Sequence, residues 1–235
     1  MEDKQRTGDG LKAENIVESE IVALLREGNE CSVCRSMEKS VDGWVTGAFS
    51  NLLHNENARL EMKRDGFCTD HLRRITELAR EKSDVGSVAV SIVFREVLIE
   101  QLAWLRVRRE PVFRSKRSPG PGSCVLCSVA NQTERIYLSA FSRFLQILEV
   151  RKTYEKSGSI FCINHSRYLL KKLGQSTQEW FADIQKRKYG QLTERIDEFV
   201  SKHDYRNKVP IGEERTAWLT ASKVIGEREF GNDVG

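Results

Sequence analysis

Four short motifs organise this chain: Cys31-Ser-Val-Cys34, Cys68-Thr-Asp-His71, Cys124-Val-Leu-Cys127 and Cys162-Ile-Asn-His165. Two CxxC pairs are therefore each followed by a CxxH pair, and the motifs use all six cysteines of the chain. The same order occurs twice, with an offset of about 94 residues between the copies. The pattern indicates an internal duplication, and the spacing of the cysteines and histidines indicates metal binding.

The spacing fits the way in which proteins bind zinc. Zinc takes four sulfur or nitrogen ligands in a tetrahedron, and a two-residue spacer lets both members of a pair reach one ion. We expect each pair to lie where a helix begins, because free backbone N–H groups and the helix dipole stabilise thiolates there. The sequence predicts two zinc ions in Cys3His sites, with these candidate ligands: Cys31, Cys34, Cys68, His71, Cys124, Cys127, Cys162 and His165.

Other chemistry can use the same spacing. A Cys3His set can also hold an iron–sulfur cluster, which is the main alternative cofactor. Disulfides suit an exported protein, whereas the chain begins with polar residues and lacks the apolar segment of an export signal. A redox CxxC would require a βαβ context and would leave the histidines unexplained. The grouping stays open, because a CxxC can share its ion with the CxxH of its own copy or of the other.

Composition favours a soluble helical protein. Charged residues make up 31% of the 235 residues, the net charge is +4, and only four prolines occur. No apolar run reaches about 18 residues, so we expect no membrane span. Cysteines with metal spacing and no export signal fit a cytoplasmic protein. The weak positive charge neither requires nor excludes a nucleic-acid partner.

Apolar residues recur at helical spacing along the chain, as at Met37, Val41, Trp44 and Ala48. Residues 85–108 and 179–200 read as long helices. The predicted fold class is all-α, with two duplicated metal-pinned helical modules, each with a long helix, and a helical tail. The predicted domains are a disordered N-terminus (1–13), a first repeat (14–108), a basic Pro/Gly linker (109–123), a second repeat (124–202) and a C-terminal tail (203–235).

Two segments outside the duplication carry further candidate sites. The linker contains basic residues that could contact nucleic acid, namely Arg109, Arg114, Lys116 and Arg117. The tail places a histidine near carboxylates, an arrangement that can serve general-base chemistry or simply tie the tail to the body. The candidate functional residues of the tail are His203, Asp204, Tyr205, Arg206, Glu213, Glu214 and Trp218.

The motifs and the tail together resemble a prokaryotic family of unknown function. That family has duplicated CPxC…GFCxxH units and a tail of the form KHDYR…GEE…AW. Here the corresponding stretches are Gly66-Phe67-Cys68 with His71, Lys202-His203-Asp204-Tyr205-Arg206, Gly212-Glu213-Glu214 and Ala217-Trp218. Serine or valine replaces the proline of each CPxC motif, and no candidate ligand is lost. The resemblance implies an all-helical metal-binding protein and supplies no reaction.

Two functions from different classes follow. In the first, the chain is a non-catalytic zinc-binding scaffold that binds a protein or RNA partner, because four candidate ligands for each ion leave no open position for substrate. In the second, it is an enzyme or redox protein that uses an iron–sulfur cluster, an open zinc ion, or His203, Asp204 and Glu213 of the tail. The sequence favours the first.

Overall fold

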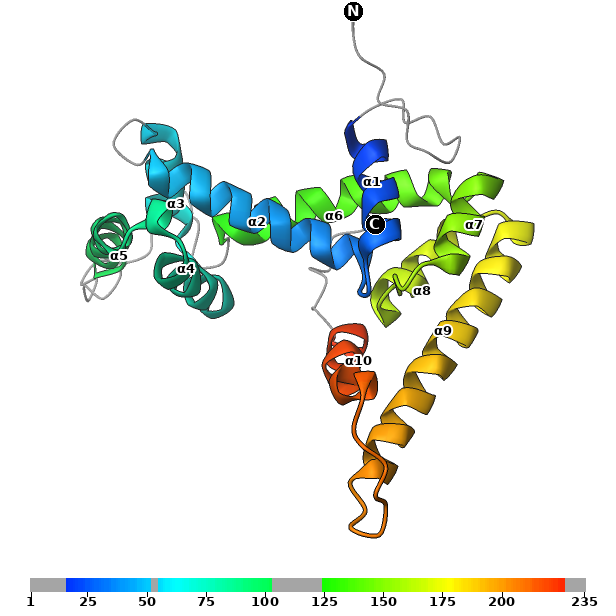
Figure 1. The fold of residues 1–235 in the computed structure, drawn as a ribbon. Helices are drawn as coiled ribbons and strands as arrows, with labels where there is room; N and C mark the ends of the chain where they lie inside the picture. The colour runs from blue at the N-terminus through cyan, green and yellow to red at the C-terminus, as the bar shows by residue number, and fades with distance from the viewer. Residues whose placement is uncertain (1–15, 52–54, 103–123, 227–235) are drawn as a thin grey trace, which may run out of the picture. The chain divides into compact units, whose positions relative to one another are not determined.

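The computed structural model describes residues 16–51, 55–102 and 124–226 (Figure 1). Within these ranges the chain forms ten α-helices and no strand, which confirms the predicted all-α class. The helices are α1 (Ile16–Glu27), α2 (Ser32–Ser50), α3 (Glu56–Asp65), α4 (Thr69–Glu81), α5 (Ser87–Leu102), α6 (Val125–Phe144), α7 (Leu148–Lys156), α8 (Ile163–Lys172), α9 (Gln175–Lys202) and α10 (Ala217–Ile225), with short 3-10 turns at Ser83–Val85 and Glu213–Thr216. The predicted N-terminal segment 1–13 and linker 109–123 lie outside the described residues.

The chain divides into two compact units, and each unit takes segments from both sequence copies. Unit one comprises residues 1–36 and 134–235, and unit two comprises residues 37–133. The divisions fall inside α2 and α6. These units therefore do not coincide with the repeats at 14–108 and 124–202 that the sequence suggests.

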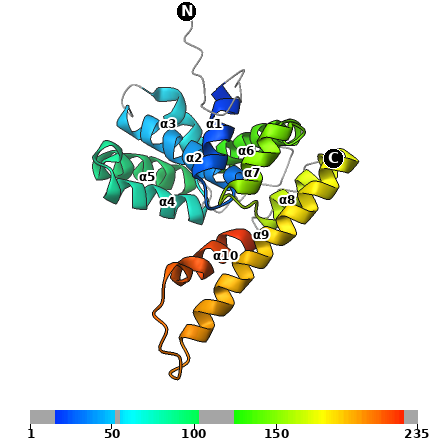
Figure 2. The same cartoon turned by 45° about the vertical axis from the view of Figure 1, so that its right-hand side comes forward.

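Unit one is built around the long helix α9. Its aromatic core contains Phe141, Tyr154, Phe161 and Phe181, all fully buried, and the rings of Phe141 and Phe161 meet edge-on with centroids 5.0 Å apart. Helix α10 lies beside α9 (Figure 2) and buries Ala217, Ala221 and Val224 in a second cluster with Ile160 and Leu192. Spacings of three and four residues place these small α10 side chains on one face.

Unit two packs α5 against α3 and α4. Helix α3 begins at an N-cap, where the side chain of Asn55 accepts a hydrogen bond from the Ala58 N–H. It ends at Gly66, whose positive φ of 67° suits glycine. The buried apolar residues around these three helices include Met62, Ile75, Leu78, Val85, Val90 and Val93.

The long helices occur close to their predicted positions. Helix α9 begins four residues before the predicted start at residue 179 and ends two residues beyond 200. Helix α5 covers residues 87–102 of the predicted 85–108, and residues 103–108 lie outside the described part of the chain. None of the helices in the described ranges has the length and apolar character needed to span a membrane.

Candidate metal centres

All four motifs occupy the first turn of a helix. The first cysteine of each motif directly precedes α2, α4, α6 or α8, and its carbonyl accepts the first helical hydrogen bond from the residue four positions later. The four N···O distances are 3.0 Å for Arg35 to Cys31, 2.9 Å for Leu72 to Cys68, 3.2 Å for Ser128 to Cys124 and 2.9 Å for Ser166 to Cys162. The expected placement at helix N-termini is confirmed, and the helix dipoles there favour thiolate.

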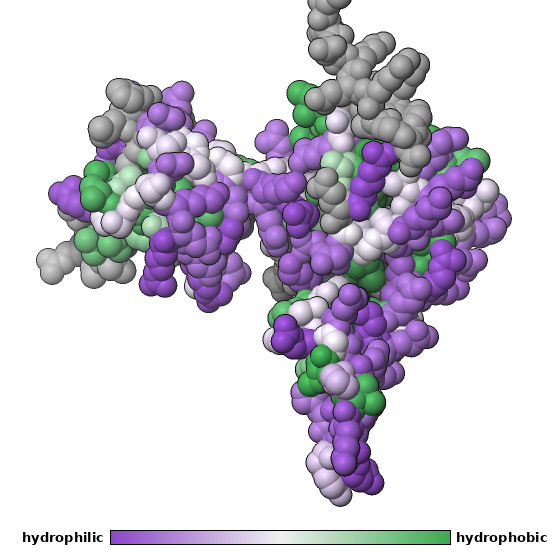
Figure 3. Space-filling view, in the orientation of Figure 1, coloured by the Kyte–Doolittle hydropathy of each residue, from purple (hydrophilic) through white to green (hydrophobic). Residues whose placement is uncertain are grey.

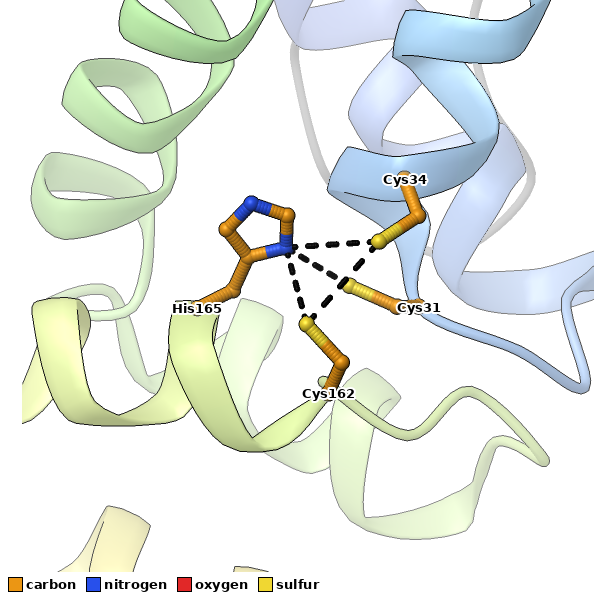
Figure 4. Close-up of side chains that lie close together, drawn as sticks. All are labelled: Cys31, Cys34, Cys162 and His165. Atoms are coloured by element: carbon orange, nitrogen blue, oxygen red, sulfur yellow. Dashed lines mark hydrogen bonds between the residues drawn. The ribbon is translucent and has the colours of Figure 1, made fainter. Parts of the chain in front are cut away.

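The motifs come together across the two sequence copies. Cys31, Cys34, Cys162 and His165 form one group in unit one, hereafter site one (Figure 4). Cys68, His71, Cys124 and Cys127 form the second group in unit two, hereafter site two. Within each group the four donor atoms all lie within 4.8 Å of one another, so each group could hold a metal ion. Of the two groupings that the sequence left open, the structure has the exchanged one.

The distances in site one are close to the edges of a coordination tetrahedron, with the sulfur–nitrogen separations somewhat shorter than ideal. The Nδ1 atom of His165 lies 3.2 Å from the sulfurs of Cys31 and Cys162 and 3.5 Å from that of Cys34. The sulfurs of Cys34 and Cys162 are 3.9 Å apart. With normal Zn–S and Zn–N bond lengths, a tetrahedron has S–S edges of about 3.8 Å and S–N edges of about 3.6 Å.

Site two repeats this geometry. The Nδ1 atom of His71 lies 3.1 Å from the sulfur of Cys68, 3.3 Å from that of Cys124 and 3.4 Å from that of Cys127. The sulfurs of Cys68 and Cys127 are 3.8 Å apart. Both histidines therefore turn the same ring nitrogen toward three sulfurs, and the two sites offer the same donor set.

A backbone hydrogen bond joins the two motifs of each site. In site one the N–H of Ile160 donates to the Glu30 carbonyl at 3.3 Å, beside a contact of 2.8 Å between the hydroxyls of Ser32 and Ser159. In site two the N–H of Val125 donates to the Gly66 carbonyl at 3.4 Å. Each pair of motifs is thus aligned by the main chain as well as by its donor atoms.

Glu134 contacts the histidine of site one. Its carboxylate lies 2.8 Å from Nε2 of His165, on the ring edge opposite the sulfurs. A carboxylate in this position fixes the orientation of a metal-binding histidine and makes it a stronger ligand. The 93-residue offset between the CxxC motifs aligns Glu134 with Val41, an apolar residue. The sequence reasoning missed Glu134, and this replacement of an apolar by an acidic residue was the available signal.

The two sites also differ in burial. Cys31, Cys162 and His165 are at most 3% exposed, whereas Cys68, His71 and Cys127 are only half-buried. Hydrogen bonds from Cys31 and Cys34 lower the pKa of Cys162. Burial alone would lower the pKa of His165, but hydrogen bonds to Cys162, Cys31 and Glu134 outweigh it and raise that pKa to about 11.

The tail residues do not form a catalytic cluster. Nδ1 of His203 donates to the Phe199 carbonyl at 2.8 Å, and Asp204 pairs with Arg206 at 2.7 Å. Among the described residues, no hydrogen bond or ion pair joins His203 to Asp204, Glu213 or Glu214. Tyr205 is 91% exposed, and Trp218 is 54% exposed.

Glu214 instead fastens the tail to α9. Its buried carboxylate accepts hydrogen bonds from the Gly212 N–H at 2.7 Å and from Lys202 at 3.1 Å. The backbone N–H of Gly212 is the largest influence on this carboxyl, and its pKa falls to about 2. The Glu213 carbonyl accepts a further hydrogen bond from Arg195 at 3.2 Å. The stretch Gly212-Glu213-Glu214 therefore secures α10 against α9.

Unit one also has a groove of about 500 Å³ along α9, which the sequence did not suggest. Lys188 lies in its wall, where its ammonium donates to the Ser157 carbonyl at 2.6 Å and sits 4.6 Å from the centre of the Tyr154 ring. Burial lowers the pKa of Lys188 to about 8.

The basic residues expected to contact nucleic acid, Arg109, Arg114, Lys116 and Arg117, lie outside the described residues.

Comparisons with models of protein families, with curated proteins and with solved structures found no match. The resemblance drawn from the motifs and the tail remains an expectation.

Proposed function

We propose that this chain is a non-catalytic helical scaffold held by two structural zinc ions, which presents its helices to a protein partner. The observation that carries the proposal is the convergence of eight cysteine and histidine side chains into two sets of four. In each set the separations are close to those of a tetrahedron around one ion. Soft sulfur donors with one imidazole are the ligands that structural zinc prefers.

The short distances between donor atoms favour a single ion over an iron–sulfur cluster. Around one ion, ligand sulfurs lie about 3.8 Å apart, and the separations here are 3.9 Å and 3.8 Å. A cluster distributes its protein ligands over several iron atoms, so its ligand atoms stand farther apart. Four protein donors also leave no coordination position for water or substrate, which supports a structural role.

Metal binding at these sites would contribute directly to folding. Cys34 and Cys162 are 128 positions apart in the chain, and Cys68 and Cys127 are 59 positions apart. Closing such loops costs conformational entropy, which the binding free energy of the ion offsets. The zinc ions would thus supply stability that the modest apolar cores of the two units supply only in part.

The surface favours a protein partner. Large apolar side chains are exposed on α10, where Trp218, Leu219 and Ile225 are each at least 44% exposed, and on α5. Apolar and aromatic side chains of this kind form the centres of protein interfaces. RNA binding depends on the basic run at residues 109–117 and is the second candidate. A catalytic function based on the tail would require His203 to act with the tail carboxylates, and their separate hydrogen bonds speak against it.

Metal analysis of the purified protein tests the zinc assignment. We expect two zinc ions per chain and no visible absorbance. Cys162→Ser should retain one ion, and His203→Asn, which changes a histidine outside both sites, should retain two. A brown protein with bound iron would overturn the proposal, as would an unchanged metal content in Cys162→Ser.

Affinity capture from native cells tests the partner. We expect a captured protein that resists nuclease treatment and is lost with Trp218→Ser. Capture that is abolished by nuclease and by the combined replacement of Arg114, Lys116 and Arg117 would instead establish RNA binding and refute the protein-partner assignment.

A further inference from the structure

Helix α5 is apolar on two opposite faces. Val90 and Val93 face the core of unit two and are buried. On the other side the helix exposes five large apolar side chains, with exposed fractions between 36% and 73%, and Figure 3 shows apolar residues gathered over this part of the unit. These side chains are Val88, Ile92, Leu98, Ile99 and Leu102. A surface helix normally keeps such a face polar, so this face is suited to an interface.

The spacing on this face is that of a helix-pairing seam. Positions 88, 92, 95, 99 and 102 are separated by four, three, four and three residues, which is the a/d pattern of a heptad repeat. Leu98 flanks the seam. Arg95, which is exposed, is the only charged residue among these seam positions. A seam with a period of 3.5 residues suits packing against a second helix. Side chains of one seam then fit as knobs into the holes between side chains of the other.

The charge of Arg95 decides the orientation in which a second α5 fits this seam. We propose that α5 pairs with α5 of a second copy of this chain in antiparallel orientation. With Ile92 opposite the partner's Leu102, Arg95 lies opposite the partner's Ile99 and beside the partner's Glu96, which flanks the seam one turn before Ile99. A parallel pairing would instead set Arg95 against its own counterpart, and like charges in a seam are unfavourable.

Glu96 is held in place within each copy, where it pairs with Arg59 of α3. Its side chain is 25% exposed, so the carboxylate stays accessible at the edge of the seam. Each copy thus offers an apolar seam with one arginine and one flanking acid, which complement each other after a two-fold rotation.

The expected association is weak. In this register residues 92–102 of each copy overlap, and a seam of this length covers less than the roughly 800 Å² per partner of a standard stable interface. We therefore expect a dissociation constant on the order of 10 µM to 1 mM. The prediction concerns the full-length, metal-loaded chain and does not depend on the nature of the metal.

Sedimentation equilibrium over a wide concentration range tests the proposal. The wild type should dimerise reversibly, and Ile99→Glu should weaken association at least about tenfold, because it buries a carboxylate in the seam. Ile136→Glu makes the same change at a similarly exposed position on α6 and should leave association unchanged. Circular dichroism should show that both variants keep the wild-type helix content.

A charge exchange makes the test specific for the antiparallel register. Arg95→Glu and Glu96→Lys should each weaken self-association, since each creates like-charge contacts. An equimolar mixture of the two should associate more strongly than either alone, because residue 95 of each variant then meets an opposite charge at residue 96 of the other. A wild type that stays monomeric to about 1 mM, as it would if another part of the chain covered α5, would overturn the proposal. Unchanged dimerisation of Ile99→Glu would do the same.

Discussion

The exchanged grouping of the motifs predicts how many metal ions are lost when two cysteines are replaced together. Cys31 and Cys162 lie in the same site, although they belong to different sequence copies, whereas Cys31 and Cys68 belong to one copy but to different sites. The double variant Cys31→Ser/Cys162→Ser should therefore lose one metal ion and keep the other. The double variant Cys31→Ser/Cys68→Ser should lose both. A within-copy grouping predicts the reverse.

The stability effect should follow the same rule. Structural zinc contributes about 10–16 kcal/mol of apparent binding free energy in small zinc domains at neutral pH. This is as large as the total stability of a typical domain, about 5–15 kcal/mol. Loss of one ion should thus unfold the unit that contains it. In Cys31→Ser/Cys162→Ser, unit one should lose its protection while unit two keeps it.

Metal content and hydrogen exchange together provide the assay. Elemental analysis gives ions per chain, and exchange read by peptide mass spectrometry reports which residues have lost protection. We expect fast exchange in α7, α8 and α9 of Cys31→Ser/Cys162→Ser, and wild-type exchange in α3, α4 and α5. Retention of one ion by Cys31→Ser/Cys68→Ser would refute the grouping. Equal loss of protection in both units would refute the assignment of one ion to each unit.

Three further predictions concern differences between parts of the structure. Glu134→Gln should weaken metal binding at site one roughly 10–100-fold and leave site two unchanged, as measured by competition with a chromophoric chelator. Under limiting chelator the wild type should release the ion of site two first, because Cys68, His71 and Cys127 are only half-buried, and Cys68→Ser should remove this early phase. The pKa of Glu214 is lowered from 4.5 to about 2, so its stabilisation of the tail is complete above pH 4.5 and is lost as the pH falls toward 2. Amide exchange in α10 should show this loss in the wild type. The variant Glu214→Gln should lack this pH dependence.

Local spacing was sufficient to predict the candidate donors and the helix starts. A CxxC or CxxH motif at a helix start brings its two donors to one side of the first turn, and this geometry depends only on neighbouring residues. The long helices were likewise predictable, because their apolar residues recur at helical spacing over many turns. Helix boundaries away from the motifs were less accurate, and α9 begins four residues earlier than predicted.

The grouping of the motifs was not predictable in this way. Both copies carry the same residue types at the same spacing. Either CxxH motif could therefore complete a Cys3His set with the CxxC motif of Cys34 or with that of Cys127. The choice depends on tertiary contacts, such as the hydrogen bond from Ile160 to Glu30, between residues far apart in the chain. The tail was misleading for a related reason, because neighbours in sequence such as His203 and Asp204 bond to different partners in space.

The exchanged sites also predict how the two sequence copies hold together. Each site takes its CxxC from one copy and its CxxH from the other. If a protease site is inserted after Pro119 and cut, each fragment will carry half of the donors of both sites. We therefore expect the fragments to remain associated in gel filtration, and to separate when a strong chelator removes the metal, because two sets of metal bonds then no longer join them.

The matched control for this cut is the same experiment on Cys31→Ser/Cys162→Ser. It has one intact site, so its fragments should stay together before chelation but separate at a lower chelator concentration than those of the wild type. Fragments that separate while each retains its own metal would contradict the exchanged grouping, because only a site complete within one copy can survive the separation. The cut thus tests in one step whether the duplicated modules fold separately or, as the donor atoms indicate, only through each other.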